Sequence, residues 1–158
     1  MVPGKKGKQA VLSIWVILVL TIVSCNSRTV YDQFKTVHRS GWDKDSVAYF
    51  SVFIPDTMSR YDVMVTVRNN AAYPYQNFWM FIDEQSPTGK VEKDTVECYL
   101  ADDRGRWLGR GFSVYSMPVL IAHHKKFHHR GYYFFGIRQG MRDDLLKGIT
   151  AIGLEIRK

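Results

Sequence analysis

From Trp42 to the C-terminus, hydrophobic side chains recur at every second position of the chain. The segment 61–68 is the clearest case, because its tyrosine and three valines alternate with polar or flexible residues. Side chains on a β-strand point alternately to the two faces of a sheet, so a period of two is typical of a strand with one buried face. We therefore predict a half-buried strand over 61–68, with Val65 pointing into the core.

Further short strands follow the same pattern along the chain. The segments that show it are 48–54, 78–84, 91–100, 132–139 and 152–156. The segment 112–122 is less regular, and Pro118 limits any strand there to the edge of a sheet, because proline has no N–H to donate. Turn residues at 69–70, 86–89 and 102–105 separate the segments.

The spacing of these elements predicts the fold class. Short strands with turn signals every 8–12 residues or so are typical of an antiparallel sandwich. A parallel sheet would need helices between the strands, and the only helical candidate is 141–147, which Gly148 ends. The predicted fold is all-β: a single antiparallel β-sandwich of jelly-roll or Ig-like type, with at most one short helix.

The first 24 residues have the composition of a lipoprotein signal peptide. Residues 1–8 carry three lysines and no acid, residues 10–23 are almost continuously apolar, and Cys25 follows. An apolar run of this length is shorter than the ~20 residues that a membrane-spanning helix needs. A signal peptidase that cuts before Cys25 would leave a lipid-modified cysteine, so we predict Cys25 as the lipid attachment site.

This division predicts a signal peptide over 1–24, a polar tether over 25–40 and a β-sandwich domain over 41–158. Cleavage would leave 134 residues, the size of one ordinary domain. It would lower the formal charge from +7 to +4, because three lysines leave with the signal peptide. The remaining basic residues are scattered, whereas a nucleic-acid-binding protein clusters them on one element. We therefore expect no nucleic-acid partner.

Cys98 is the second of two cysteines, so lipid modification of Cys25 would leave it without a disulfide partner. It shares one face of the predicted strand 91–100 with Val96 and Leu100. That position favours the role of a small buried hydrophobe. No neighbouring base identifies Cys98 as a catalytic thiol.

Two pairs of neighbouring acids resemble catalytic carboxylates only superficially. Asp102-Asp103 lies in a predicted turn, Asp143-Asp144 lies at the start of the short predicted helix, and neighbours on a strand point to opposite faces. The chain also lacks a Gly-x-Ser-x-Gly elbow, a glycine-rich phosphate loop and a His-Glu-x-x-His helix. We expect no enzyme activity and no cofactor; a hydrolase would need a cleft with converging acids.

Four of the five histidines lie in the run 123–129, His-His-Lys-Lys-Phe-His-His. Imidazoles are good ligands for Zn, Cu or Ni. However, two lysines and Arg130 stand among the histidines, and no acid within the run offsets their charge. We expect a solvated basic loop and no metal; contact with anionic head groups and a metal site are the alternatives.

Six aromatic residues are candidates for a platform that stacks on sugars. They are Trp42, Trp79, Trp107, Tyr73, Tyr75 and Tyr115. Core packing explains most of them equally well, because large rings supply much of the buried area of a small sandwich. Exposed rings on one face would favour a glycan-binding module, and buried tryptophans would contradict it.

A series of separated motifs runs through the chain after Cys25. They are Ile-Pro-Asp-Thr at 54–57, Arg-Tyr-Asp-Val at 60–63, Arg-Asn-Asn at 68–70, Tyr-Pro-Tyr-Gln-Asn at 73–77, Asp-Thr-Val-Glu at 94–97, Leu-Ala-Asp at 100–102, Gly-Arg-Trp-Leu-Gly-Arg-Gly at 105–111, Met-Arg at 141–142 and Gly-Ile at 148–149. In this order they resemble the GldH family of gliding-motility lipoproteins of the Bacteroidetes.

The resemblance implies a cell-envelope lipoprotein of the outer membrane that is needed for surface gliding and has no cofactor. It also implies other gliding lipoproteins and the type IX secretion machinery as partners. No acidic pair follows Cys25, which favours an orientation toward the periplasm. We expect a non-enzymatic interaction or scaffold module; a glycan- or peptidoglycan-binding module is the alternative.

The segments 69–77 and 102–111 are the expected partner surface. The candidate contact residues are Arg68, Tyr73, Tyr75, Asn77, Asp102, Trp107 and Arg110. Glycine, asparagine and proline in these segments would fix the shape of the loops. The alternative is that these residues only set the turns.

Overall fold

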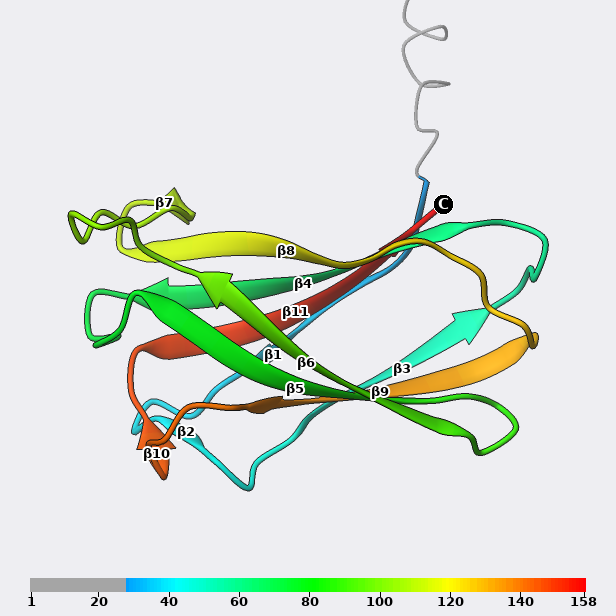
Figure 1. Cartoon of the computed structure of the whole chain (residues 1–158), viewed down its shortest axis with the longest axis horizontal. Helices are drawn as coiled ribbons and strands as arrows, with labels where there is room; N and C mark the ends of the chain where they lie inside the picture. Colours follow the sequence, from blue (N-terminus) through cyan, green and yellow to red (C-terminus); the bar gives the residue numbers. More distant parts are fainter. Residues whose placement is uncertain (1–27) are drawn as a thin grey trace, which may run out of the picture.

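The computed structural model describes residues 28–158, which form two β-sheets packed face to face (Figure 1). The predicted signal peptide and Cys25 lie outside the described residues. The strands of the described part, in chain order, are β1 (Thr29–Thr36), β2 (Trp42–Asp43), β3 (Ala48–Ile54), β4 (Tyr61–Asn70), β5 (Asn77–Gln85), β6 (Val91–Tyr99), β7 (Arg110–Gly111), β8 (Val114–Lys125), β9 (Gly131–Gln139), β10 (Leu145–Leu146) and β11 (Ile149–Arg157).

The sheets are antiparallel throughout the described residues. The five-stranded sheet has the order β1-β11-β4-β8-β7, the four-stranded sheet has the order β3-β9-β5-β6, and β10 pairs with β2 beside them. Residues 28–158 contain no helix, and hence none that is long and apolar enough to cross a membrane. The prediction of an all-β antiparallel sandwich is confirmed.

The strand β4 shows why the sequence folds in this way. Its residues alternate strictly between buried and half-buried positions, and Val65 is 0% exposed. The buried face of β4 meets buried aromatic and aliphatic side chains of the four-stranded sheet, such as Phe50, Phe78 and Phe135. The strand and the register predicted for 61–68 are confirmed. Asn69 lies buried within the strand, and the predicted turn therefore begins one residue later, at Asn70.

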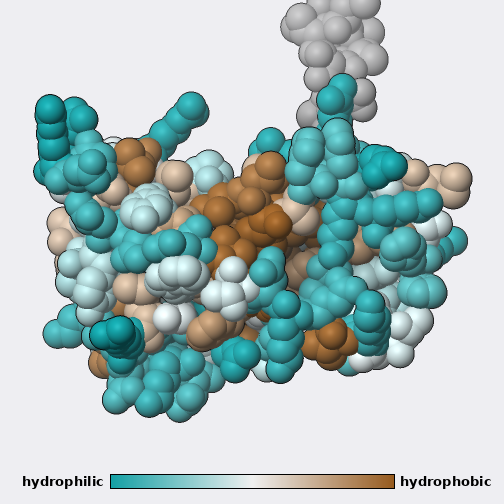
Figure 2. Space-filling view, viewed as in Figure 1, coloured by the Kyte–Doolittle hydropathy of each residue, from teal (hydrophilic) through white to brown (hydrophobic). Residues whose placement is uncertain are grey.

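The prediction for Pro118 is also confirmed. The strand β8 pairs with β4 over most of its length, but it pairs with β7 only through Tyr115 and Ser116. Beyond Ser116 the other side of β8 has no strand partner among the described residues. The missing N–H of Pro118 is tolerated at such an edge. Figure 2 shows hydrophobic side chains in the gap between this edge and the edge formed by β6.

The tether predicted over 25–40 is wrong for residues 29–36, which form β1. This strand pairs with β11 along the edge of the five-stranded sheet, and Val30 and Tyr31 pack against the core. Its sequence is mostly polar, in keeping with the exposure of six of its eight residues to solvent. The folded domain therefore includes residues 29–36.

The one short helix that the sequence allowed over 141–147 does not form in the described part of the chain. Leu145 and Leu146 form β10 and pair with Asp43 and Trp42. The backbone carbonyl of Asp144 accepts a hydrogen bond from the Lys44 N–H over 2.9 Å. In a two-turn helix the backbone N–H and C=O groups of this segment would bond to each other. Here they form hydrogen bonds with residues 42–44 instead, and Leu146 is fully buried.

The first prediction tests the register of β4. Val65→Asp should lower the free energy of unfolding by at least about 3 kcal/mol, because the carboxylate would be buried without a partner. Thr66→Asp, one residue along on the half-buried outer face, should cost only about 1 kcal/mol. Urea denaturation followed by circular dichroism measures both. Equal stability of the two variants would contradict the register.

The second prediction concerns Cys98, which is buried and free of disulfides in the described part of the chain. Burial raises the pKa of its thiol to about 12. The thiolate is the reactive form, so iodoacetamide at pH 8.5 should leave Cys98 unmodified in the folded protein and modify it in urea. Mass spectrometry of the peptide that contains Cys98 measures this. Rapid modification of the folded protein would contradict the burial.

Candidate interaction surfaces

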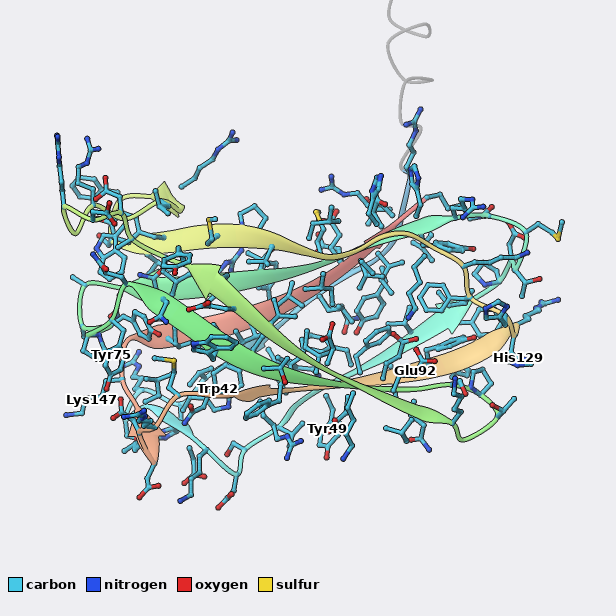
Figure 3. All side chains as sticks on the ribbon, viewed as in Figure 1. Trp42, Tyr49, Tyr75, Glu92, His129 and Lys147 are labelled. Carbon is cyan, nitrogen blue, oxygen red and sulfur yellow. The ribbon has the colours of Figure 1, made fainter. Side chains whose placement is uncertain are left out.

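The two predicted contact segments meet at one end of the sandwich. The N–H groups of Leu100 and Ala101 donate to the carbonyl of Gln76 over 2.7 and 3.1 Å, and the side-chain amide of Gln76 donates to the carbonyl of Asp102 over 2.9 Å. We call the distal loop surface these two segments extended by two residues to the start of β8, residues 69–77 and 102–113. In Figure 3 Tyr75 marks this end, and His129 lies at the opposite end.

Tyr73 is a core residue of this end and not an exposed contact. It is 3% exposed, and its hydroxyl donates to the carbonyl of Asn77 over 2.6 Å. Burial raises the pKa of the Tyr73 hydroxyl. The loop packs so closely that a Cβ atom on Gly148 would lie 2.1 Å from the Tyr73 nitrogen, so position 148 requires glycine.

Asp102 holds the shape of the hairpin 102–106. One carboxylate oxygen accepts the backbone N–H groups of Arg104 and Arg106 over 3.0 and 2.9 Å, and the other accepts Arg106 Nε over 2.8 Å. The hydrogen bond from the Arg106 backbone N–H contributes most to lowering the pKa of the Asp102 carboxyl group. The structure therefore supports the alternative reading for this residue, that it sets a turn.

Trp107 lies between core and surface. Its ring stacks on Tyr115 with centroids 5.7 Å apart and lies 6.5 Å from the ring of Tyr73. It is half-buried and packs against the core. Loss of this ring would therefore disturb packing as well as any contact, which makes Trp107 a poor single probe of binding.

The remaining predicted contact residues have mixed roles. The Tyr75 hydroxyl donates to Asp143 over 2.9 Å, and the Asn77 amide donates to Glu97 over 2.7 Å. The guanidinium of Arg68 lies 3.7 Å from the centroid of the Phe34 ring, on the outer face of the five-stranded sheet. Arg110 is exposed on β7.

Phe112, which is absent from the predicted contact residues, is 92% exposed at the tip of the β7–β8 hairpin. A Cβ atom on Gly111 would lie 1.9 Å from the carbonyl oxygen of Val114, so this turn is tight and requires glycine at 111. The tightness holds Phe112 out in solvent. In the sequence, the large aromatic residue directly after Gly111 in a short turn could have indicated that Phe112 is exposed.

A second surface was also missed: the outer face of the four-stranded sheet, which we call the aromatic face. Seven of its rings among the described residues are each at least 37% exposed: Tyr49, Phe53, Trp79, Phe81, Tyr99, Tyr132 and Phe134. In Figure 3 Tyr49 points away from the sandwich on this side. A strand with apolar side chains on both of its faces is typical of a sheet that is covered on both faces. The segments 78–82 and 132–135 are continuously apolar and could have indicated this surface from the sequence.

Polar groups also lie on the aromatic face. Arg138 of β9 and Asp83 of β5 form an ion pair with 3.0 Å between Nη2 and Oδ2. At the distal end, a cavity of about 440 Å³ is lined by Tyr75, Asn77, Trp79, Gly140, Met141 and Arg142. The aromatic face and the distal loop surface therefore adjoin through this cavity, with Trp79 on one side and Tyr75 on the other.

The six-residue sugar platform expected from the sequence does not form. Trp42 is 3% exposed and packs against Phe78, and Tyr73 is buried as described above. Buried rings offer no face to a sugar. Of the three tryptophans in that set, Trp79 is the exposed one, and it belongs to the aromatic face.

The expectation of a solvated basic loop over 123–129 is wrong for part of the run. His123, His124 and Lys125 end the strand β8, and Phe127 is buried in the core. The Lys125 ammonium lies 2.9 Å from Glu84, whose pKa is raised by burial. His128 and His129 are exposed, as expected of a loop.

Comparison with known proteins places the chain in a family. A family model described as GldH lipoprotein matches residues 29–156. A gliding motility lipoprotein GldH homolog of Christiangramia forsetii is 33% identical over 92% of this chain and 93% of that protein. The gliding motility lipoprotein GldH of Flavobacterium johnsoniae is 29% identical over 92% of this chain and 94% of that protein.

Among solved structures, the VP2 subviral particle of infectious bursal disease virus aligns with 82% of this chain and 32% of that chain. Its sequence identity of 11% and TM-score of 0.32 are too low to bear on function. The family model and the two relatives cover nearly the whole described domain and agree with the motifs in the sequence. The chain therefore belongs to the GldH family of gliding-motility lipoproteins.

Proposed function

We propose that this protein is a non-enzymatic interaction module of the cell envelope, anchored by lipid on Cys25, which binds a partner protein through the aromatic face. The observation that carries the proposal is the set of seven exposed rings on one face of one sheet. Exposed apolar side chains that gather on one face of a folded domain are typical of an interaction site. Aromatic residues and arginine are enriched at the centres of protein interfaces, and the Arg138–Asp83 pair lies on this face.

The position of Cys25 supports a close approach of the domain to the membrane. Only residues 26–28 separate it from Thr29, the first residue of β1. Four steps along an extended chain reach at most about 14 Å. Stable anchoring needs two or more acyl chains, which a diacylated cysteine would supply. Confinement near the membrane raises the effective concentration of partners there, so that weak contacts suffice.

The cavity at the distal end of the aromatic face gives the proposed interface a point of specificity. Its lining combines the Trp79 ring, the Met141 thioether and polar groups from Asn77 and Arg142. An apolar side chain of a partner would fit such a cavity. Phe112 and Leu108 on the adjoining distal loop surface would extend the contact.

The family suggests which partners to test. The names of the relatives refer to gliding motility, and other gliding lipoproteins and the type IX secretion machinery are the partners that we propose. We also propose attachment to the outer membrane with the domain facing the periplasm, because no acidic pair follows Cys25.

A glycan is the second candidate ligand for the aromatic face. The polar side chains of Ser51, Asp83 and Arg138 lie among the rings, and such a mixture of rings and polar groups favours a sugar as the ligand. However, the one interacting pair of rings within this set, Phe53 and Tyr132, is tilted by 59° and does not form a flat surface. We therefore favour a protein partner, and the experiment below distinguishes the two.

The third prediction concerns the anchor. Cys25→Ala should release the protein from the membrane or leave an unprocessed precursor, because the lipid could no longer be attached. Fractionation of cells into soluble and membrane parts, with the mass of the mature protein, measures this. A variant that is cleaved normally and stays in the membrane fraction would contradict lipid anchoring at Cys25.

The fourth prediction concerns the aromatic face. Trp79→Ala combined with Tyr99→Ala should reduce recovery of envelope proteins in a cross-linking pull-down by at least about tenfold, because aromatic anchors dominate interface energies. The matched control is Leu120→Ala, which removes a side chain of similar exposure from the outer face of the other sheet.

Both variants should melt near the parental temperature, since the altered side chains are exposed. Unchanged recovery of proteins from the folded double variant would contradict the aromatic face as the partner surface. Recovery of polysaccharide and no defined protein with the parental chain would replace the protein partner with a glycan.

A further inference from the structure

The end of β8 contains a β-bulge that brings two histidines opposite one aspartate. Tyr61 pairs with Lys125 and Val63 pairs with Ala122, so Asp62 alone on β4 faces both His123 and His124 on β8. Bulges of this kind redirect side chains and are enriched near functional sites.

The backbone of His124 completes the arrangement. Among residues 28–158 it is the one non-glycine residue with positive φ, at 51°. Consecutive side chains of a regular strand point to opposite faces, whereas here the two imidazoles stack with centroids 3.7 Å apart and planes at 25°. A left-handed conformation at a non-glycine residue costs free energy and is concentrated at functional positions.

Asp62 contacts both histidines. One of its carboxylate oxygens lies 2.9 Å from the backbone nitrogen of His124, which donates to it, and 2.9 Å from Nδ1 of His123. The hydrogen bond from the His124 backbone N–H contributes most to lowering the pKa of the Asp62 carboxyl group. One possible ligand atom of each of the three residues lies within 4.8 Å of the other two, and both histidines are exposed to solvent.

The basic side chains near Asp62, His123 and His124 repel a bound cation less than the sequence indicated, because most of them are paired with acids. The Lys125 ammonium is held by Glu84 at 2.9 Å and lies 3.7 Å from Glu92. Arg157 forms a two-point ion pair with Glu155. Arg60, whose guanidinium lies 3.4 Å from the carbonyl of His124, is a nearby cation that is oriented toward the backbone. The acid missing from the run 123–129 is supplied by β4.

We propose that Asp62, His123 and His124 bind a divalent transition-metal ion of the Zn²⁺ type. Two neighbouring ligands with bonds of about 2.1 Å to one ion lie roughly 3.0–3.4 Å apart, and the Asp62–His123 separation of 2.9 Å is close to that range. Bonding through Nδ1 of His123 requires the neutral imidazole with its proton on Nε2. Imidazole and carboxylate ligands suit Zn, Cu and Ni.

With three ligands from the protein, the fourth position of a tetrahedral ion would hold water. The ion would join the end of β8 to the start of β4, the end of the sandwich from which the chain leads to Cys25. It would thus fasten the bulge at the membrane-proximal end. That placement uses the proposed lipid anchor, whereas metal binding itself does not depend on it.

Titration calorimetry with Zn²⁺ tests the site in full-length protein purified in detergent without a polyhistidine tag. We expect one Zn²⁺ per chain. Asp62→Asn keeps an oxygen acceptor for the His124 N–H and should weaken binding at least tenfold, and the double variant His123→Ala, His124→Ala should abolish it. Zinc should also raise the melting temperature of the parental protein and not of the double variant.

The matched control is the double variant His128→Ala, His129→Ala, which removes two imidazoles from the same run. It should bind Zn²⁺ within about twofold of the parental protein. The proposal is overturned if the parental chain shows no one-to-one binding at 100 µM zinc or below. It is equally overturned if folded Asp62→Asn binds normally, or if the control loses as much affinity as the His123 and His124 variant.

Discussion

The burial of one face of β4 is the interaction on which the rest of the structure depends. The strand lies in the middle of the five-stranded sheet, with β11 on one side and β8 on the other. A slip of one residue would move its valines into solvent and Asp62 and Arg68 into the core, so the register is strongly determined. Because β11 carries β1 and β8 carries β7, the positions of all five strands follow from this one register.

That register also places the functional features. It sets Asp62 against the bulge of β8 at one end of the sheet, and it ends β4 at Asn70, within the distal loop surface. Ten strand residues separate the two ends by roughly 30 Å. The start of β1 lies next to the C-terminus of the chain in Figure 1, at the end of β4 that carries Asp62. A lipid on Cys25 would therefore hold that end at the membrane and leave the distal loop surface farther from it.

The two sheets differ in what their outer faces offer. The outer face of the five-stranded sheet combines polar residues such as Asp62, Thr66 and Arg68 with a few exposed hydrophobic side chains, among them Phe34 and Leu120. The outer face of the four-stranded sheet carries seven exposed aromatic rings, which gain free energy when another molecule covers them. This asymmetry, more than any single residue, points to the aromatic face as the surface that binds. The cavity between Trp79 and Tyr75 connects it with the distal loop surface.

The sequence by itself determined the strands with strict alternation, including 61–68 and 48–54, the edge position of Pro118, the burial of Cys98 and the family. These follow from local periodicity, from the chemistry of single residues and from motif order. The sequence also identified the loops that meet at the distal end, although Tyr73 and Asp102 proved to hold those loops in shape. Only the tertiary structure decided that 29–36 is a strand and 141–147 is not a helix, because their backbone partners come from residues far away in the chain. Likewise, only strand pairing could bring Asp62 to His123 and His124, since the 60 residues between Asp62 and His123 hide the contact from any local pattern.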